Sequence, residues 1–130
     1  MYEATTRGVR VAVTPQYLDD KSDPDDNRWV WAYTIEIANL SETTVQLRTR
    51  HWRIIDAHGR CQEVHGTGVV GEEPVIPPSH AFEYTSACPL PTSSGLMVGE
   101  YEMEAEDGER FAVEIPAFSL DIPGDTRVHH

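Results

Sequence analysis

The chain reads RWVWAYTIEIANL from Arg28 to Leu40, and this stretch carries the clearest structural signal in the sequence. Large apolar side chains occupy every second position, so that in an extended chain they share one face: Trp29, Trp31, Tyr33, Ile35 and Ile37. Aromatic and β-branched residues favour strands. We therefore predict a strand over about 28–40, at the centre of a hydrophobic core.

The same period of two recurs along the rest of the chain, with no convincing helical period. Strands are predicted over about 9–14, 44–56, 61–64, 82–86, 97–106 and 110–117. Asp107-Gly108, between the last two, favours a tight primed turn. About seven short strands predict an all-β fold, an immunoglobulin-like or fibronectin type III-like antiparallel sandwich of two sheets. The expected core contains Trp31, Tyr33, Ile35, Ile37, Tyr101, Met103, Phe111, Val113 and Ile115.

The composition limits the classes of partner. The chain has 130 residues, and a single domain is expected over 1–126, followed by a disordered tail at 127–130. Ten basic and 22 acidic residues give a net charge of −12, which disfavours nucleic acid and anionic membranes. The sequence shows no signal peptide or spanning segment, and Cys61 and Cys88 are too few for a secreted disulfide framework. A cytoplasmic protein with reduced thiols is expected.

The sequence Gly66-Thr67-Gly68-Val69-Val70-Gly71 has the glycine spacing of a dinucleotide-binding loop. That motif needs a following helix, but here Glu72-Glu73-Pro74 follows and Pro77-Pro78 comes soon after, which excludes one. One interpretation is that the loop amides form a nest for a phosphate. The other is that Gly66, Gly68 and Gly71 provide turns and close backbone approach. The adjacent acids favour the second interpretation, and Pro77-Pro78 stiffens the exit of the loop into a pre-ordered surface suited to recognising a protein.

Histidine and cysteine ligands for a metal are spaced poorly. His58, Cys61 and His65 lie within eight residues, and Cys88 could supply a fourth ligand. However, Cys61 and His65 are about 13 Å apart on an extended strand, too far to share one ion. The histidines at 129 and 130 are left aside because they end the chain. No metal site and no cofactor are expected.

An acidic loop follows the first strand. Asp23, Asp25 and Asn27 copy the opening spacing of an EF-hand, but Arg28 takes the glycine position and Thr34 the position of the bidentate glutamate. A solvated, mobile loop is expected there instead.

Two stripes of charge are predicted on neighbouring strands. Arg48 and Arg50 are expected to lie on one face of their strand. On the same face of the neighbouring strand, the glutamates of the 100–106 segment are expected to form ion pairs with them across the ladder. Alternatively, Arg48, Arg50, Arg53 and Arg60 form a patch for a ligand or partner, because guanidinium reads carboxylate and phosphate well.

Five motifs stand in order along nearly the whole chain: Arg50-His51-Trp52; Gly66 to Gly71 with Pro74; Phe82-Glu83-Tyr84-Thr85-Ser86 before Cys88-Pro89-Leu90; Gly95 with Met97, Gly99, Tyr101 and Met103; and Phe111 to Ile115 with Phe118. Together they resemble the ApaG family. The resemblance implies a fibronectin type III-like fold and a link to cobalt and magnesium tolerance or efflux. It also implies a binding role, since the domain recurs in eukaryotic F-box and polymerase-interacting proteins. It brings no catalytic residues.

Signatures of enzymes are missing around the available nucleophiles. His51 is the best single candidate for proton transfer, although a strand histidine beside Trp52 is more often a hydrogen-bonded core residue. We expect a non-enzymatic module that binds another protein, with Gly66, Gly68, Gly71, Arg48, Arg50 and Arg53 as candidate contact residues. The alternatives are a binder of a small phosphate-bearing ligand at the glycine loop and, third, direct metal binding.

Overall fold

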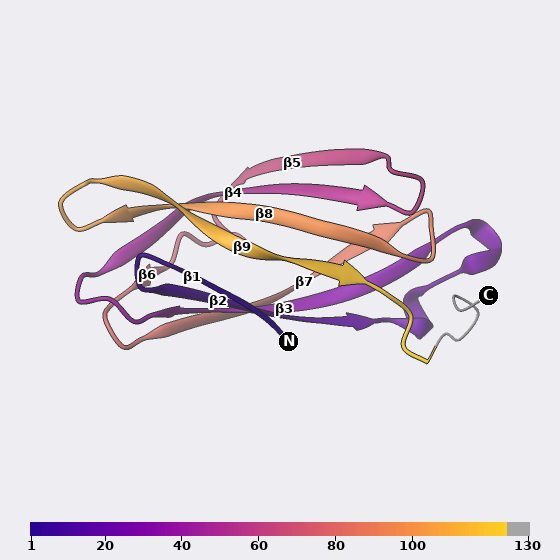
Figure 1. The fold of residues 1–130 in the computed structure, drawn as a ribbon, viewed down its shortest axis with the longest axis horizontal. Coiled ribbons are helices and arrows are strands. Elements are labelled where there is room, and N and C mark those ends of the chain that lie inside the picture. Colours follow the sequence, from indigo (N-terminus) through magenta and orange to yellow (C-terminus); the bar gives the residue numbers. More distant parts are fainter. Residues whose placement is uncertain (125–130) are drawn as a thin grey trace.

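A computed structural model describes residues 1–124, which form two antiparallel sheets packed face to face (Figure 1). The first sheet has the order β1-β2-β3-β7, with strands Tyr2–Thr6, Val9–Tyr17, Trp29–Asn39 and Ala81–Leu90. The second has the order β5-β4-β8-β9, with strands Cys61–Thr67, Val45–Asp56, Gly95–Ala105 and Arg110–Leu120. The two-residue strand β6 (Val75–Ile76) pairs with the start of β4. The predicted two-sheet sandwich is confirmed, and β1 and β6 are strands that the sequence did not predict.

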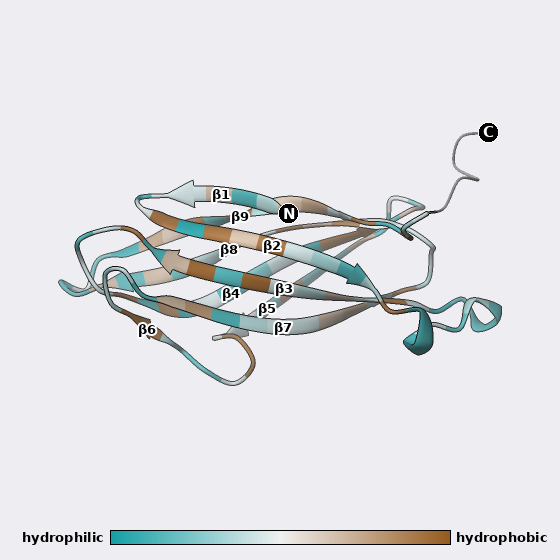
Figure 2. Ribbon diagram, turned by 90° about the horizontal axis from the view of Figure 1, so that it is seen from below, coloured by the Kyte–Doolittle hydropathy of each residue, from teal (hydrophilic) through white to brown (hydrophobic). Residues whose placement is uncertain are grey.

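Strand β3 is central in its sheet, between β2 and β7. Its alternating hydropathy, visible with that of β2 in Figure 2, places Trp31, Tyr33, Ile35 and Ile37 between the two sheets. The disordered tail predicted at 127–130 lies outside the described residues. None of the helical segments in the described chain is long and apolar enough to cross a membrane.

All of the predicted core residues are buried except Phe111. Phe111 is only half-buried near the start of β9, where the Arg7 guanidinium lies 4.3 Å from its ring centroid. The prediction that Phe111 lies in the core is wrong, because alternation predicts which face of the sheet a residue occupies but not how far along the strand the opposite sheet extends. Phe118, at the other end of β9, is fully buried instead.

The hairpin between β8 and β9 is confirmed, but its turn is not the predicted primed one. A primed turn of this kind needs positive φ at both central residues. Here only Gly108 has positive φ (88°), and its N–H donates to the Ala105 carbonyl. The Ala105 N–H donates to Glu109, so three residues form the loop and Gly108 ends it in the left-handed conformation.

A β-bulge in β4 changes which side chains face the core. Leu47 pairs with Met103 and Arg50 pairs with Tyr101, and the register shifts between Leu47 and Thr49. The extra residue reverses the alternation, so that Arg50 points between the sheets while Arg48 stays on the outer face. The prediction that Arg48 and Arg50 share a face is therefore wrong.

The two sides of the sandwich differ. On one side β9 packs against β1 and β2, and the Tyr2 hydroxyl meets the Ser119 hydroxyl at 2.9 Å. On the opposite side the edge strands β5 and β7 each pair with only one strand. The sandwich is therefore joined along one side and open along the other.

Candidate functional site

A groove opens between the free edges of β5 and β7. It consists of two adjoining depressions, with volumes of about 310 and 290 Å³. Four residues line both of them: Tyr33, Arg50, Trp52 and Ser86. The first depression extends under the loop after β5, at Val69–Gly71. The second is more apolar and extends to Ile54, Val64 and Met97. The groove therefore joins a charged end to an apolar end.

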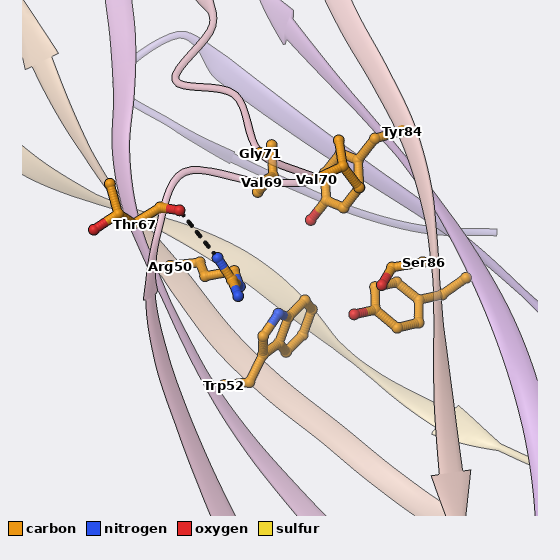
Figure 3. A pocket seen from close by; sticks show the side chains of 9 residues that line it. Arg50, Trp52, Thr67, Val69, Val70, Gly71, Tyr84 and Ser86 are labelled. Atoms are coloured by element: carbon orange, nitrogen blue, oxygen red, sulfur yellow. Dashed lines mark hydrogen bonds between the residues drawn. The ribbon is translucent and has the colours of Figure 1, made fainter.

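Arg50 is fixed in this groove by the backbone of the glycine segment. Its Nη1 donates to the carbonyl oxygen of Thr67 at 3.2 Å (Figure 3) and to that of Gly68 at 2.8 Å. A Cβ on Gly66 would lie 2.6 Å from the guanidinium carbon, so a larger residue there would displace the end of the Arg50 side chain. Gly66 thus permits the observed position of Arg50 on β5.

The charge of Arg50 has no acidic partner among residues 1–124. Its hydrogen bonds go to backbone carbonyls, and its Nη2 and Nε make none to the described residues. Around it, burial raises the pKa values of Tyr33 and Tyr84, which keeps these phenols neutral at physiological pH. The groove therefore contains the positive charge of Arg50, whose Nη2 and Nε make no hydrogen bond to the described residues and can donate to a ligand.

The glycine loop satisfies much of its own hydrogen bonding. The Gly68 N–H donates to the Arg48 carbonyl at 2.9 Å, and the Val69 N–H donates to Glu72 at 2.8 Å. An anion nest in this loop would use the four amides of residues 68–71, and two of these already donate to backbone carbonyls. Gly68 has φ +64°, and a Cβ there would overlap the Glu72 carbonyl oxygen. This geometry favours the structural interpretation of the glycines.

Replacement of Gly68 by alanine should destabilise the fold by about 1 to 3 kcal/mol, because a side chain is forced into a left-handed backbone and against a carbonyl. Urea unfolding measures this loss. Gly71→Ala is the matched control, since it has positive φ but open space around its Cβ position. ATP at millimolar concentration should raise the melting temperature of neither variant nor wild type. Saturable stabilisation of wild type that disappears in Gly68→Ala would contradict the structural interpretation.

Val70 is the most unusual residue of the loop. It has φ +43°, a conformation that β-branched residues rarely adopt, and 54% of its surface is exposed at the rim of the groove. Strain of this kind costs about 1 to 3 kcal/mol and clusters at binding and switch sites. Nothing in the residue pattern predicts this conformation, because it follows from the loop's internal hydrogen bonds.

The remaining arginines are not brought together with Arg50. Arg48 lies 3.5 Å from Glu104 and 3.3 Å from Glu73, which confirms that one of its predicted pairs crosses from β4 to β8. Arg53 is exposed on the outer face. Arg60 bonds Asp56 at 2.8 Å in the turn after β4. The four arginines therefore do not form one patch, and only Arg50 faces the groove with the glycine loop.

The structure also places the candidate metal ligands. His58, Cys61 and His65 do not form a cluster in the described chain; a different group, His51, Glu63 and His65, does. Cys61 is exposed, and burial raises the pKa of the Cys88 thiol to about 11, which disfavours a thiolate ligand. Spacing along one strand could not predict the new group, because its members come from two strands.

The acidic loop forms two short 3₁₀ turns, Asp19–Lys21 and Pro24–Asp26. All of its aspartates are exposed, and they form no three-ligand cluster in the described chain. The EF-hand likeness therefore has no counterpart in the geometry.

Comparison with known proteins extends over nearly the whole chain. A family model described as the ApaG domain matches residues 19–105. Relatives named Protein ApaG, from Azorhizobium caulinodans and Xanthobacter autotrophicus, are each 59% identical over 128 residues, 98% of this chain and 98% of the relative. A crystal structure of a Bordetella pertussis protein named ApaA has a TM-score of 0.88 at 42% identity, covering 96% of this chain and 100% of that one.

Proposed function

The chain belongs to the ApaG domain family, and from this premise we propose that it is a non-enzymatic module that binds another cytoplasmic protein through the groove between β5 and β7. The family resemblance links such proteins to cobalt and magnesium tolerance. On this proposal the chain contributes to cobalt and magnesium tolerance by binding a partner protein.

Arg50 is the observation that carries the proposal. Its guanidinium donates hydrogen bonds to two backbone carbonyl oxygens and has no carboxylate partner in the described residues. An acidic group of a binding partner would stabilise this charge most, because hydrogen bonds between charged groups are stronger than neutral ones, above all in a partly desolvated groove. The expected contact is an Asp or Glu side chain of the partner.

The rest of the groove suits an extended protein segment. Val70 presents an exposed apolar side chain on a loop ordered by its own hydrogen bonds, which limits the entropy lost on binding. The depression at Ile54, Val64 and Met97 can take an apolar side chain next to the acidic one. A small phosphate-bearing ligand would use Arg50 but would leave that apolar end empty, so a protein segment fits the whole groove better.

Selection from a random peptide library displayed on phage tests the proposal. We expect enriched peptides with an acidic residue close to an apolar one, and Arg50→Gln should weaken their binding at least about tenfold in calorimetric titration. Arg53→Gln is the matched control, since Arg53 lies on the outer face, and its affinity should stay within a factor of about two.

Val70→Gly separates binding from stability. Relief of positive-φ strain, about 1 to 3 kcal/mol, offsets the added chain entropy of glycine, about 0.5 to 1 kcal/mol, so the fold should not be weakened. Peptide binding should nevertheless fall. Enrichment without acidic residues, equal effects of the two arginine variants, or nucleotide binding that depends on Arg50 would contradict the proposal, and the last would establish the small-ligand alternative.

A further inference from the structure

The outer face of the β4–β5 pair carries a cluster of metal-ligating side chains that is separate from the groove. His51 and His65 are directly paired across the two strands, and Glu63 lies two residues before His65 on the same face of β5. His51 points away from the groove, since its neighbours Arg50 and Trp52 line it. The strand register thus brings together two imidazoles and one carboxylate from distant parts of the sequence.

The distances in this cluster match a metal site. Glu63 Oε2 lies 3.7 Å from His51 Nε2 and 3.6 Å from His65 Nε2. Ligands about 2.0 to 2.2 Å from a tetrahedral ion are themselves about 3.4 Å apart. The three ligand atoms all lie within 4.8 Å of one another. To bind one ion, the two imidazole rings would have to turn out of their stacked arrangement, so that the in-plane lone pairs of both Nε2 atoms point at the metal.

Hydrogen bonds do not already satisfy the cluster. The His51 Nε2 atom is shielded from solvent and has no hydrogen-bond partner in the described structure. Both contacts to Glu63 are longer than a hydrogen bond. The two rings stack with centroids 4.0 Å apart and an angle of 12° between their planes, so both side chains lie on the same face of the strand pair. A buried polar atom without a partner is costly, and a bound ion would relieve that cost.

We propose that His51, Glu63 and His65 form a binding site for a divalent transition metal ion of the class that prefers imidazole, such as Zn²⁺. Three protein ligands leave a fourth position for water, as in open zinc sites. Glu100 lies opposite His51 on β8 and adds negative charge to this face. Arg53 lies opposite Glu63 but forms no ion pair with it in the described residues, so the carboxylate is available.

Titration of the chelator-treated protein with Zn²⁺, followed by calorimetry, tests this site. Every sample carries His129→Ala and His130→Ala, so that the terminal histidines supply no ligands. We expect one Zn²⁺ per chain. Since even the outer-shell partners of ligands contribute about 10- to 100-fold in affinity, His65→Ala, Glu63→Gln and His51→Ala should each weaken binding at least about tenfold. His65 and Glu63 are exposed on an edge strand, so their variants should fold even if the His51 variant does not.

Two matched controls lie nearby. His58→Ala removes a histidine from the adjacent turn, and Cys61→Ser removes the exposed thiol of β5; neither should change the affinity by more than about twofold. Anomalous diffraction at the zinc edge should place the ion between His51 and His65. No stoichiometric binding, binding abolished by Cys61→Ser, or unchanged binding in both His65→Ala and Glu63→Gln would overturn the proposal. None of these results bears on peptide binding in the groove.

Discussion

Replacement of Phe118 by alanine should lower the free energy of unfolding by about 3 to 5 kcal/mol. Phe118 is fully buried, and its ring centroid lies 5.9 Å from those of both Tyr33 and Trp52 and 6.1 Å from that of Tyr2. Truncation removes these contacts and leaves a cavity where β9, β3 and β4 meet. Urea unfolding followed by tryptophan fluorescence measures the loss, since Trp52 is next to the cavity.

Phe111→Ala provides the comparison on the same strand. Phe111 is half-buried under the Arg7 guanidinium, so its truncation leaves a surface that water can fill, and the expected loss is about 1 to 2 kcal/mol. Equal losses for the two variants would mean that the core is not concentrated at the Phe118 end of β9.

Period-two alternation was enough to predict the core-facing residues of β3, β7 and β8 and of the first half of β9, where a slip of one residue would expose the whole set. It fails in the second half of β9, because a register shift places Phe118, three residues after Ile115, in the core as well.

In β4 the apolar positions change phase, from Val45 and Leu47 before the bulge to Trp52 and Ile54 after it. The prediction assumed one unbroken alternation along this strand, so it missed the change of face. This is why the groove, which depends on Arg50 facing inward, was not predicted.

The candidate sites likewise depend on contacts between strands, which spacing along the sequence does not reveal. The three glycines were singled out from their spacing, yet their reasons differ: Gly66 makes room for Arg50, and Gly68 avoids the Glu72 carbonyl. The cluster of His51, Glu63 and His65 depends on the register of β4 with β5, which the turn at 57–60 sets. Spacing along the chain can exclude a site within one strand, but it cannot predict one formed across two.

Replacement of Asn39 by alanine should destabilise the fold by about 3 kcal/mol, more than is usual for a polar residue. Asn39 is fully buried, and its Nδ2 donates at 2.8 Å to the carbonyls of both Thr43 and Ile76. Its Oδ1 accepts from the N–H and hydroxyl of Ser41. The side chain thus ties the end of β3 to the β3–β4 loop and to β6. Each buried group left without a partner costs about 1 to 3 kcal/mol, which is the physical reason for the expected loss.

Asn39→Asp tests whether the donors or merely the shape of this side chain matter. A carboxylate keeps the shape but turns an oxygen toward two carbonyl oxygens, so at pH 7 the variant should be at least as unstable as Asn39→Ala. Burial and those carbonyls favour the protonated form and raise its folded-state pKa above the ordinary value of about 4. The folded state then binds more protons than the unfolded state, so stability relative to wild type should improve as pH falls toward about 4. Ser41→Ala, which removes only one hydroxyl from the network, should cost about 1 kcal/mol or less. An Asp variant as stable as wild type at pH 7 would mean that the amide donors do not hold this corner of the sandwich together.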